Sequence, residues 1–200
     1  MVKNRFVQHT QNPRPEVTQE DKSNEIGCGM IIIDFEASSL RKDSHPIEVA
    51  WGDSPETIKS YLLNPDYMAG WTDWNPKCFE FHGITQEELR NKGADPRKVA
   101  EQMVAELAGK DVYSDEPRYD SRWKNRLISD SGYDPSVIRI RDLNHYLKHR
   151  INAASYCKSF NDLVCSFECC EKRRHRAGVD VYWLFKLLEY FEQELCESSS

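Results

Sequence analysis

Residues 30–36 read MIIIDFE, an apolar run that ends in two acids, Asp34 and Glu36, with a single residue between them. A continuous isoleucine run without polar alternation is typical of a strand buried on both faces, as in the centre of an α/β sheet. Residues i and i+2 of a strand lie on the same face, with Cα atoms roughly 6.5 Å apart. The two carboxylates therefore project to one side, where a divalent cation would offset the unfavourable burial of like charges. The alternative is that the strand has ended and both acids are solvated loop residues.

The length and composition of the chain are those of a single domain. The chain has 200 residues, of which 39% are hydrophobic, enough for one core. No segment approaches the roughly 18 apolar residues of a membrane-spanning helix, and the N-terminus lacks the pattern of a signal peptide. We therefore expect a cytoplasmic protein without a membrane partner. Residues 1–26 are polar and contain Pro13 and Pro15, so we expect a flexible tail there and a folded domain over residues 27–200.

The charge balance and the cysteines argue against several classes of protein. A formal net charge of −6 argues against a non-specific nucleic-acid coat, which is normally basic, but it allows a nucleic-acid enzyme with a local basic rim. Seven cysteines without regular pairing are expected to be reduced and packed as small hydrophobic side chains. Cys165, Cys169 and Cys170 precede His175, but their spacing lacks the paired ligands of structural zinc sites. Zinc is therefore the weaker interpretation.

The pattern of apolar residues predicts a mixed sheet covered by helices. Strands are expected at about residues 29–36, 46–52 and 58–63, and their short connections indicate an antiparallel meander. Asp95-Pro96 is a strong helix start, a cap followed by a first-turn proline. The later elements are expected to be a strand at 111–114, a helix from Pro117 to Ile128, a strand at 137–140, and helices at about 142–154, 160–173 and 178–196. This order predicts one α/β domain with a mixed five-stranded sheet and helices on both faces.

Residues 64–84 are irregular and rich in aromatic side chains. Such side chains either line a pocket for stacked bases or fill a core under a long loop, and we favour the core for the tryptophans. Thr85, with Glu88 three residues later, predicts the start of a short helix.

The final predicted helix carries an acid on its buried stripe. Asp180, Leu184, Leu187 and Phe191 share one side by the 3.6-residue period, so the carboxylate points toward the core. The alternative is that Asp180 only stabilises the N-terminus of the helix through its dipole. His175 lies five residues earlier, where a basic loop enters the helix, and is either a surface residue or a general base beside a metal site.

A third acidic segment follows the predicted strand at 111–114. Asp115, Glu116 and Asp120 lie where this strand is followed by a helix. Ligands of open α/β sheets bind at the carboxyl ends of strands, which is also where Asp34 and Glu36 lie. All three acids are therefore candidates for a shared metal site, and their spacing does not choose among them.

Three short motifs together resemble the signature of the DEDDh exonucleases, the DnaQ-like group within the ribonuclease H-like fold. The motifs are Asp34-Phe35-Glu36-Ala37, Tyr119-Asp120 and His175-Arg176-Ala177-Gly178-Val179-Asp180. Their order, their expected placement on strand or helix and the four-residue gap between His175 and Asp180 agree with the family over about residues 29–195. His82-Gly83-Ile84-Thr85 also resembles a recurrent element of the proofreading-type members. The group includes polymerase proofreading subunits, RNase T and oligoribonuclease.

The resemblance implies a metal-dependent 3′-to-5′ exonuclease on a ribonuclease H-like fold. Such an enzyme hydrolyses phosphodiester bonds of single-stranded DNA or RNA, or of 3′ overhangs, and releases nucleoside monophosphates. Two divalent cations, Mg²⁺ or Mn²⁺, are the implied cofactors, since these ions prefer hard oxygen ligands. The implied metal ligands are Asp34, Glu36, Asp120 and Asp180. His175 is the implied general base, and Ala37, Leu40 and His82 are implied to border the terminal nucleotide, with a core position as the alternative for Leu40.

The chain departs from the family pattern in two places. Asp115 and Glu116 stand in the neighbourhood where the second motif commonly has Asn, so Asp115 stays an alternative ligand to Asp120. Ser38-Ser39 stands where the first motif commonly has Gly, so the floor of the nucleotide pocket is expected to differ.

Two other functions fit the same fold. One is a non-catalytic nucleic-acid-binding module, although such a module needs no inward cluster of acids. The other is a metal-dependent phosphohydrolase that acts on small nucleotides. The sequence does not distinguish DNA from RNA, because that depends on contacts to the 2′-hydroxyl. The expected partner is the 3′ end of a single strand, and a homodimer is kept as an option for the assembly.

Overall fold

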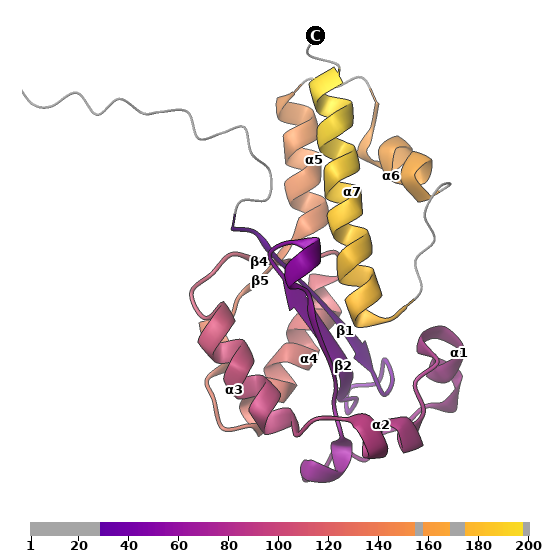
Figure 1. Ribbon diagram of the computed structural model, residues 1–200, viewed down its shortest axis with the longest axis vertical. Coiled ribbons are helices and arrows are strands. Elements are labelled where there is room, and N and C mark those ends of the chain that lie inside the picture. Colours follow the sequence, from indigo (N-terminus) through magenta and orange to yellow (C-terminus); the bar gives the residue numbers. More distant parts are fainter. Residues whose placement is uncertain (1–28, 155–157, 169–174, 198–200) are drawn as a thin grey trace, which may run out of the picture.

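A computed structural model of the chain describes residues 29–154, 158–168 and 175–197 (Figure 1). The strands are β1 (Ile31–Ala37), β2 (Pro46–Gly52), β3 (Lys59–Leu62), β4 (Val112–Ser114) and β5 (Ile140–Asp142). The helices are α1 (Phe79–His82), α2 (Gln86–Lys92), α3 (Pro96–Leu107), α4 (Pro117–Asp130), α5 (Leu143–Ala153), α6 (Phe160–Glu168) and α7 (Ala177–Glu197). The tail predicted at residues 1–26 lies outside the described residues, as do residues 169–173 of the helix predicted at 160–173.

The five strands form one mixed sheet in the order β3-β2-β1-β4-β5. β1 pairs antiparallel with β2, and β2 with β3, whereas β1 pairs parallel with β4, and β4 with β5. The predicted mixed five-stranded sheet and its antiparallel meander are both confirmed. The buried run of residues 30–36 forms the central strand of this sheet, as expected for an apolar segment without alternation.

The side chains of β1 alternate between two cores. Ile31, Ile33 and Phe35 pack with residues of α3 and α4, whereas Ile32 packs with residues of α5, α6 and α7. The predicted helices on both faces are therefore confirmed. Because alternate residues of a strand share a face, the side chains of Asp34 and Glu36 lie on the same face of the sheet as that of Ile32. This is the side covered by α5 and α7, which lie next to each other in Figure 1.

The strand predicted at residues 137–140 begins too early. A short 3-10 helix occupies Pro135–Val137, and β5 starts only at Ile140. Pro135 has no N–H for a strand ladder and has a restricted φ. The ammonium group of Lys124 also takes the carbonyls of Pro135 and Ile138 as acceptors, at 2.7 Å each. The segment is therefore a loop up to the start of β5.

Two helix starts agree with the sequence prediction. Asp95 caps α3, and its carboxylate accepts the N–H of Arg97 at 3.0 Å. Thr85 caps α2, and its hydroxyl accepts the N–H of Glu88 at 3.0 Å. Both caps satisfy an N–H group that has no partner inside its helix.

The aromatic segment at residues 64–84 divides between core and surface. Trp71 is buried in the core that contains α3 and α4, as predicted for the tryptophans. Trp74 is partly buried and packs against a small cluster at Ile84 and Leu89. Phe81, in contrast, is exposed. The segment therefore supplies both core filling and exposed aromatic surface.

α7 buries the stripe that the sequence predicts. Its buried residues include Asp180, Leu184, Leu187 and Phe191. The helix packs across β1 and β2, so the acid on this stripe lies against the sheet. Within the described ranges, neither α7 nor any other helix has the length and apolar composition required to cross a bilayer.

Candidate active site

The neighbouring strands β1 and β4 bring one group of acids together. The two strands run parallel, with Ile32 opposite Tyr113, so their carboxyl ends meet at the same edge of the sheet. Asp34, Asp115 and Asp120 each place a carboxylate oxygen within 4.8 Å of the others. Asp34 and Asp120 are buried, and Asp115 is partly exposed.

The start of α4 holds Asp120 at this edge. Pro117 opens the helix, which places Asp120 in the first turn. The hydroxyl of Ser114 donates to the Asp120 carboxylate, and the N–H of Glu116 donates to the same hydroxyl at 3.0 Å. Both rival acids, Asp115 and Asp120, thus meet Asp34. Glu116, the third candidate from the sequence, is exposed.

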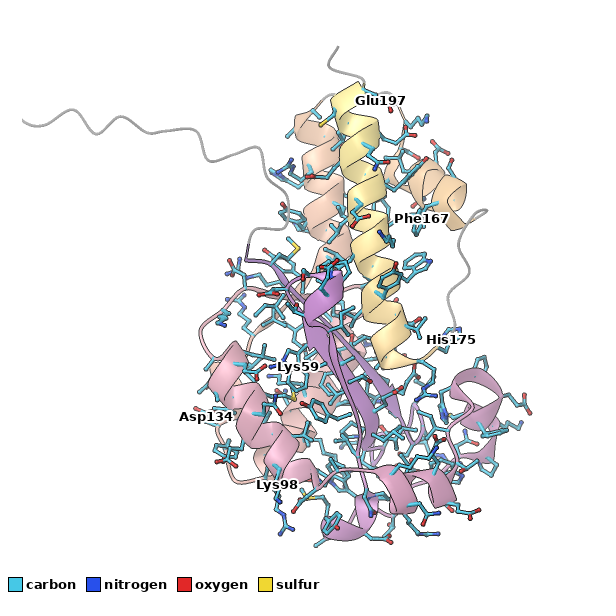
Figure 2. All side chains as sticks on the ribbon, in the orientation of Figure 1. Lys59, Lys98, Asp134, Phe167, His175 and Glu197 are labelled. Carbon is cyan, nitrogen blue, oxygen red and sulfur yellow. The ribbon has the colours of Figure 1, made fainter. Side chains whose placement is uncertain are left out.

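The start of α7 brings a second group to β1. Asp180 is buried in the first turn of α7, and His175 is exposed two residues before the helix begins. A nitrogen of His175 and carboxylate oxygens of Glu36 and Asp180 lie within 4.8 Å of one another. Figure 2 shows His175 where the chain enters α7. Because Asp34 and Glu36 share one face of β1, the two groups adjoin, and together they contain every predicted metal ligand and the predicted base.

The side chains of the two groups fit hard divalent cations. Asp34, Asp120 and Asp180 are all buried, and like charges buried near one another are unfavourable unless a cation or a proton compensates them. Carboxylate oxygens are the preferred ligands of Mg²⁺ and Mn²⁺. The residues that could hold such ions are therefore the acids of the two groups, with Asp115 included.

A pocket of about 200 Å³ opens beside Glu36. Its lining contains the three residues predicted to border a nucleotide, Ala37, Leu40 and His82. Leu40 is 64% exposed, so the alternative of a core position for Leu40 is wrong. Phe81 also lines the pocket, is 65% exposed, and meets the imidazole ring of His175 edge-on at a centroid distance of 6.1 Å. The pocket therefore joins an exposed apolar surface to the group of acids around Glu36.

His82 is held as a neutral imidazole in the wall of this pocket. Its side chain is buried, and its Nδ1 accepts the N–H of Ile84 at 3.0 Å. Burial lowers the pKa of His82 to about 4, with opposing smaller effects from the charges of Glu48 and Arg176. Since Nδ1 is an acceptor, the ring proton of His82 is on Nε2.

Asp73 is a neighbour of the site that sequence reasoning missed. The hydroxyls of Ser38 and Ser39 donate to Oδ2 of Asp73 at 2.8 and 2.6 Å, and Arg41 donates to Oδ1 at 3.4 Å. Burial opposes ionisation of Asp73, but the hydrogen bonds from Ser39 and Ser38 outweigh it and hold the pKa of this carboxyl below its usual value. The available signal was the serine pair itself, because buried hydroxyls need an acceptor.

Solved structures of exonuclease I share the fold of this chain. An exonuclease I structure described as suggesting how processivity is achieved matches with a TM-score of 0.62 at 18% identity. The complex of E. coli exonuclease I with a dA16 oligonucleotide matches with a TM-score of 0.61 at 17% identity. Each match covers 82% of this chain and 40% of the exonuclease I chain, so this chain spans less than half of that enzyme.

The comparisons establish the fold and leave the activity to the site. The mixed sheet and its helices match the ribonuclease H-like architecture of the exonuclease neighbours, which confirms the predicted fold class. No family model and no curated protein matches the sequence. These neighbours give no support to the homodimer that was kept as an option.

Proposed function

We propose that this chain is a metal-dependent 3′-to-5′ exonuclease of the DEDDh type, acting on single-stranded DNA or RNA and releasing nucleoside monophosphates. The observation that carries the proposal is the meeting of two groups of side chains on one face of β1. The groups contain the five residues of the family signature, Asp34, Glu36, Asp120, Asp180 and His175. The exonuclease I neighbours, which include complexes with dA16 and dT13 oligonucleotides, support a single-stranded substrate.

The four carboxylates would hold a pair of Mg²⁺ or Mn²⁺ ions. When bound, such a pair lowers the pKa of an attacking water and stabilises the charge of the leaving 3′ oxygen. Asp34 and Asp120 come from the edge formed by β1 and β4, and Asp180 reaches the same face from α7. The rigid elements that carry these side chains fix their oxygens before substrate arrives, which avoids reorganisation during the reaction.

His175 would take the proton of the attacking water. Its imidazole lies within 4.8 Å of carboxylate oxygens of Glu36 and Asp180, and it is exposed, so the proton can pass on to solvent. Imidazole is the side chain that most readily exchanges a proton near neutral pH. The scissile phosphate would then lie between this imidazole and the acids on β1.

The pocket beside Glu36 would hold the terminal nucleotide. Leu40 and Phe81 offer exposed apolar surfaces, and aromatic surfaces of this kind stack on bases without regard to sequence. His82 and Ala37 form part of the pocket wall. A base must be unpaired to enter such a pocket, which accounts for a preference for single strands.

The test is hydrolysis of a 5′-labelled single-stranded oligonucleotide, in DNA and RNA versions, beside a duplex with recessed 3′ ends. We expect progressively shortened labelled products and free mononucleotides, with a requirement for Mg²⁺ or Mn²⁺ that EDTA removes. Asp34→Asn should abolish the products. Asp66→Asn, at an exposed acid, is the matched control and should leave them unchanged.

The rival functions give different results in the same experiment. Release of a labelled mononucleotide as the first product would mean attack from the 5′ end and contradict the proposal. Tight binding of the oligonucleotide without cleavage would identify a non-catalytic binding module. Hydrolysis of small nucleotides with no action on the oligonucleotide would identify a small-nucleotide phosphohydrolase.

A further inference from the structure

An ion pair joins the start of α7 to the sheet. Arg176 donates from Nε to Oε2 of Glu48 at 2.9 Å and from Nη2 to Oε1 at 2.8 Å. Two such parallel bonds fix the orientation of a guanidinium as well as its distance. Glu48 belongs to β2 and is 3% exposed, so the bond reaches a buried position of the sheet.

Further donors complete the contacts of Glu48. The N–H of Ala177 donates to Oε2 at 3.0 Å, and the hydroxyl of Ser60 on β3 donates to Oε1 at 3.4 Å. Gly178 lies so close to β3 that a Cβ added to it would come within 3.1 Å of the Cβ of Ser60. The first residues of α7 are therefore held against both β2 and β3.

The residues on either side of this ion pair belong to the candidate site. His175 precedes Arg176 and has a backbone φ of 50°, a left-handed value that a non-glycine residue keeps only when its surroundings hold it. Asp180 donates its N–H to the carbonyl of Arg176 at 2.8 Å, which sets its place in the first turn. The imidazole of His175 is exposed and meets the ring of Phe81 edge-on, so its position depends on the backbone that Arg176 holds as well as on Phe81.

The charge of Arg176 also matters for the acids on β1. Glu48 stands directly opposite Glu36 in the antiparallel register, so the two side chains share a face with Cβ atoms about 4.5–5.5 Å apart. The hydrogen bond to Glu48 raises the pKa of Arg176 against the effect of burial, and attraction to Glu36 adds to the rise. The guanidinium therefore stays charged and neutralises an acid that would otherwise add to the group around Glu36.

We propose that Glu48 and Arg176 are positioning residues: their ion pair sets the imidazole of His175 beside Glu36 and Asp180 and prevents Glu48 from acting as an additional metal ligand. The inference rests on the proposed exonuclease function. Glu48 is buried, the side chain of Arg176 is 37% exposed, and such an ion pair contributes little net stability, so stability alone is a poor account of this one.

The test compares Glu48→Gln with a matched control at the other end of the sheet. Glu106→Gln serves as the control, because Glu106 also accepts a hydrogen bond from a cation, Lys59, at 2.6 Å. We expect kcat on a single-stranded oligonucleotide to fall at least about tenfold in Glu48→Gln, since a small displacement of a catalytic group is costly. KM should change by less than about threefold, and Glu106→Gln should leave both constants within about twofold.

Variants of Arg176 separate geometry from charge. Arg176→Lys keeps the positive charge but loses the two parallel bonds, so it should recover part of the kcat that Arg176→Gln loses. In Arg176→Gln the freed Glu48 should bind metal, which would appear as altered Mn²⁺ affinity in electron paramagnetic resonance titrations. If Glu48→Gln fails to fold, the double variant Glu48→Met/Arg176→Met, which leaves no unpaired buried charge, replaces it with the same expected loss of kcat.

A second measurement does not depend on turnover. The ring resonances of His175, identified by their loss in His175→Gln, should shift in the NMR spectrum of Glu48→Gln and stay in place in Glu106→Gln. A folded Glu48→Gln protein with the kcat and the His175 resonances of the control would overturn the inference. If the wild-type chain hydrolyses no nucleic acid, the proposed function fails, and the NMR comparison alone then decides whether the ion pair places His175.

Discussion

The acidic side chains at the two ends of the sheet have different neighbours. At the amino end of β1, a cavity of about 660 Å³ is lined by residues that include Ile31, Lys59 and Glu106. Glu106 has its charge compensated within the chain, by Lys59 at 2.6 Å and by the indole N–H of Trp51 at 2.9 Å. At the carboxyl end, the pocket of about 200 Å³ adjoins acids that gather with other acids and one imidazole.

The difference shows that charge arrangement, and not cavity size, distinguishes the end of the sheet that carries the proposed active site. Burial opposes ionisation of Glu106, but hydrogen bonds from Lys59, Gln102 and Trp51 outweigh it, so the pKa of this carboxyl lies below its usual value. The hydrogen bond between Lys59 and Glu106 also raises the pKa of Lys59. At the amino end of β1 the charge of Glu106 is compensated by Lys59 of the same chain. The acids at the carboxyl end are instead arranged as they would be around a bound cation. Figure 2 shows Lys59 and His175 well apart.

The largest expected effect separates the two ends directly. Asp180→Asn should lower kcat/KM by about 1,000-fold or more, because it removes a buried, proposed metal ligand and with it several kcal/mol of transition-state stabilisation. Glu106→Gln, at the other end, should stay within about twofold of wild type. Steady-state hydrolysis of a labelled single strand over a Mg²⁺ titration measures both. Equal losses in the two variants would abolish the distinction between the ends.

Removal of the imidazole should separate catalysis from metal binding. His175→Ala should reduce kcat by about 100- to 10,000-fold, as expected for the loss of a general base. Mn²⁺ affinity, measured by titration, should change by less than about threefold. His149→Ala, at an exposed histidine of α5, is the control. Full activity in His175→Ala would show that another group accepts the proton.

The rival acids of the β4–α4 junction can be ranked by the same assay. Asp120→Asn should lower kcat by about 100-fold or more, because this carboxylate is buried and oriented by Ser114. Asp115→Asn should lower it by less than about tenfold, since its side chain is partly exposed. Calorimetric titration with Mn²⁺ should show the same order. The reverse order would make Asp115 the principal ligand.

The apolar rim of the pocket should affect binding more than turnover. Phe81→Ala should raise KM by about 5- to 150-fold with little change in kcat, since stacking on a base contributes about 1–3 kcal/mol. Tyr133→Ala removes another exposed aromatic side chain and is the control. Tyr133 is suitable as a control because the next residue in the chain, Asp134, lies far from His175 in Figure 2. An equal rise of KM in both variants would point to non-specific adsorption.

The smallest effect concerns stability at the pocket end. Burial lowers the pKa of His45 and of His82 to about 4. An unfolded histidine has a pKa of about 6.5, so between about pH 6.5 and 4 the unfolded chain binds more protons than the folded one. The free energy of unfolding should therefore fall as the pH drops through this window. Urea unfolding at about pH 7 and pH 5 should show a smaller fall in His82→Gln than in wild type, and an unchanged fall in His149→Gln.

Local sequence patterns predicted the frame of the site. The isoleucine run, the i, i+2 spacing of Asp34 and Glu36 and the Asp95-Pro96 helix start depend only on residues that are neighbours in the chain. The stripe of α7 likewise follows from a 3.6-residue period that places Asp180 with its apolar neighbours. These features follow from backbone geometry and hydrophobic alternation, which act within a few residues.

Contacts between distant segments lay beyond such patterns. The serine pair indicated that an acceptor was needed but not that Asp73 would be that acceptor, and spacing could not show that Asp115 and Asp120 both reach Asp34. The bond of Arg176 to Glu48 joins residues on α7 and β2 that only the folded sheet brings together. Composition and periodicity determined most of the elements and which way their side chains face, although not the start of β5 or the presence of α1. Which charges meet was settled by the packing of helices on the sheet, because electrostatic and hydrogen-bond partners are chosen by distance in space and not by distance along the chain.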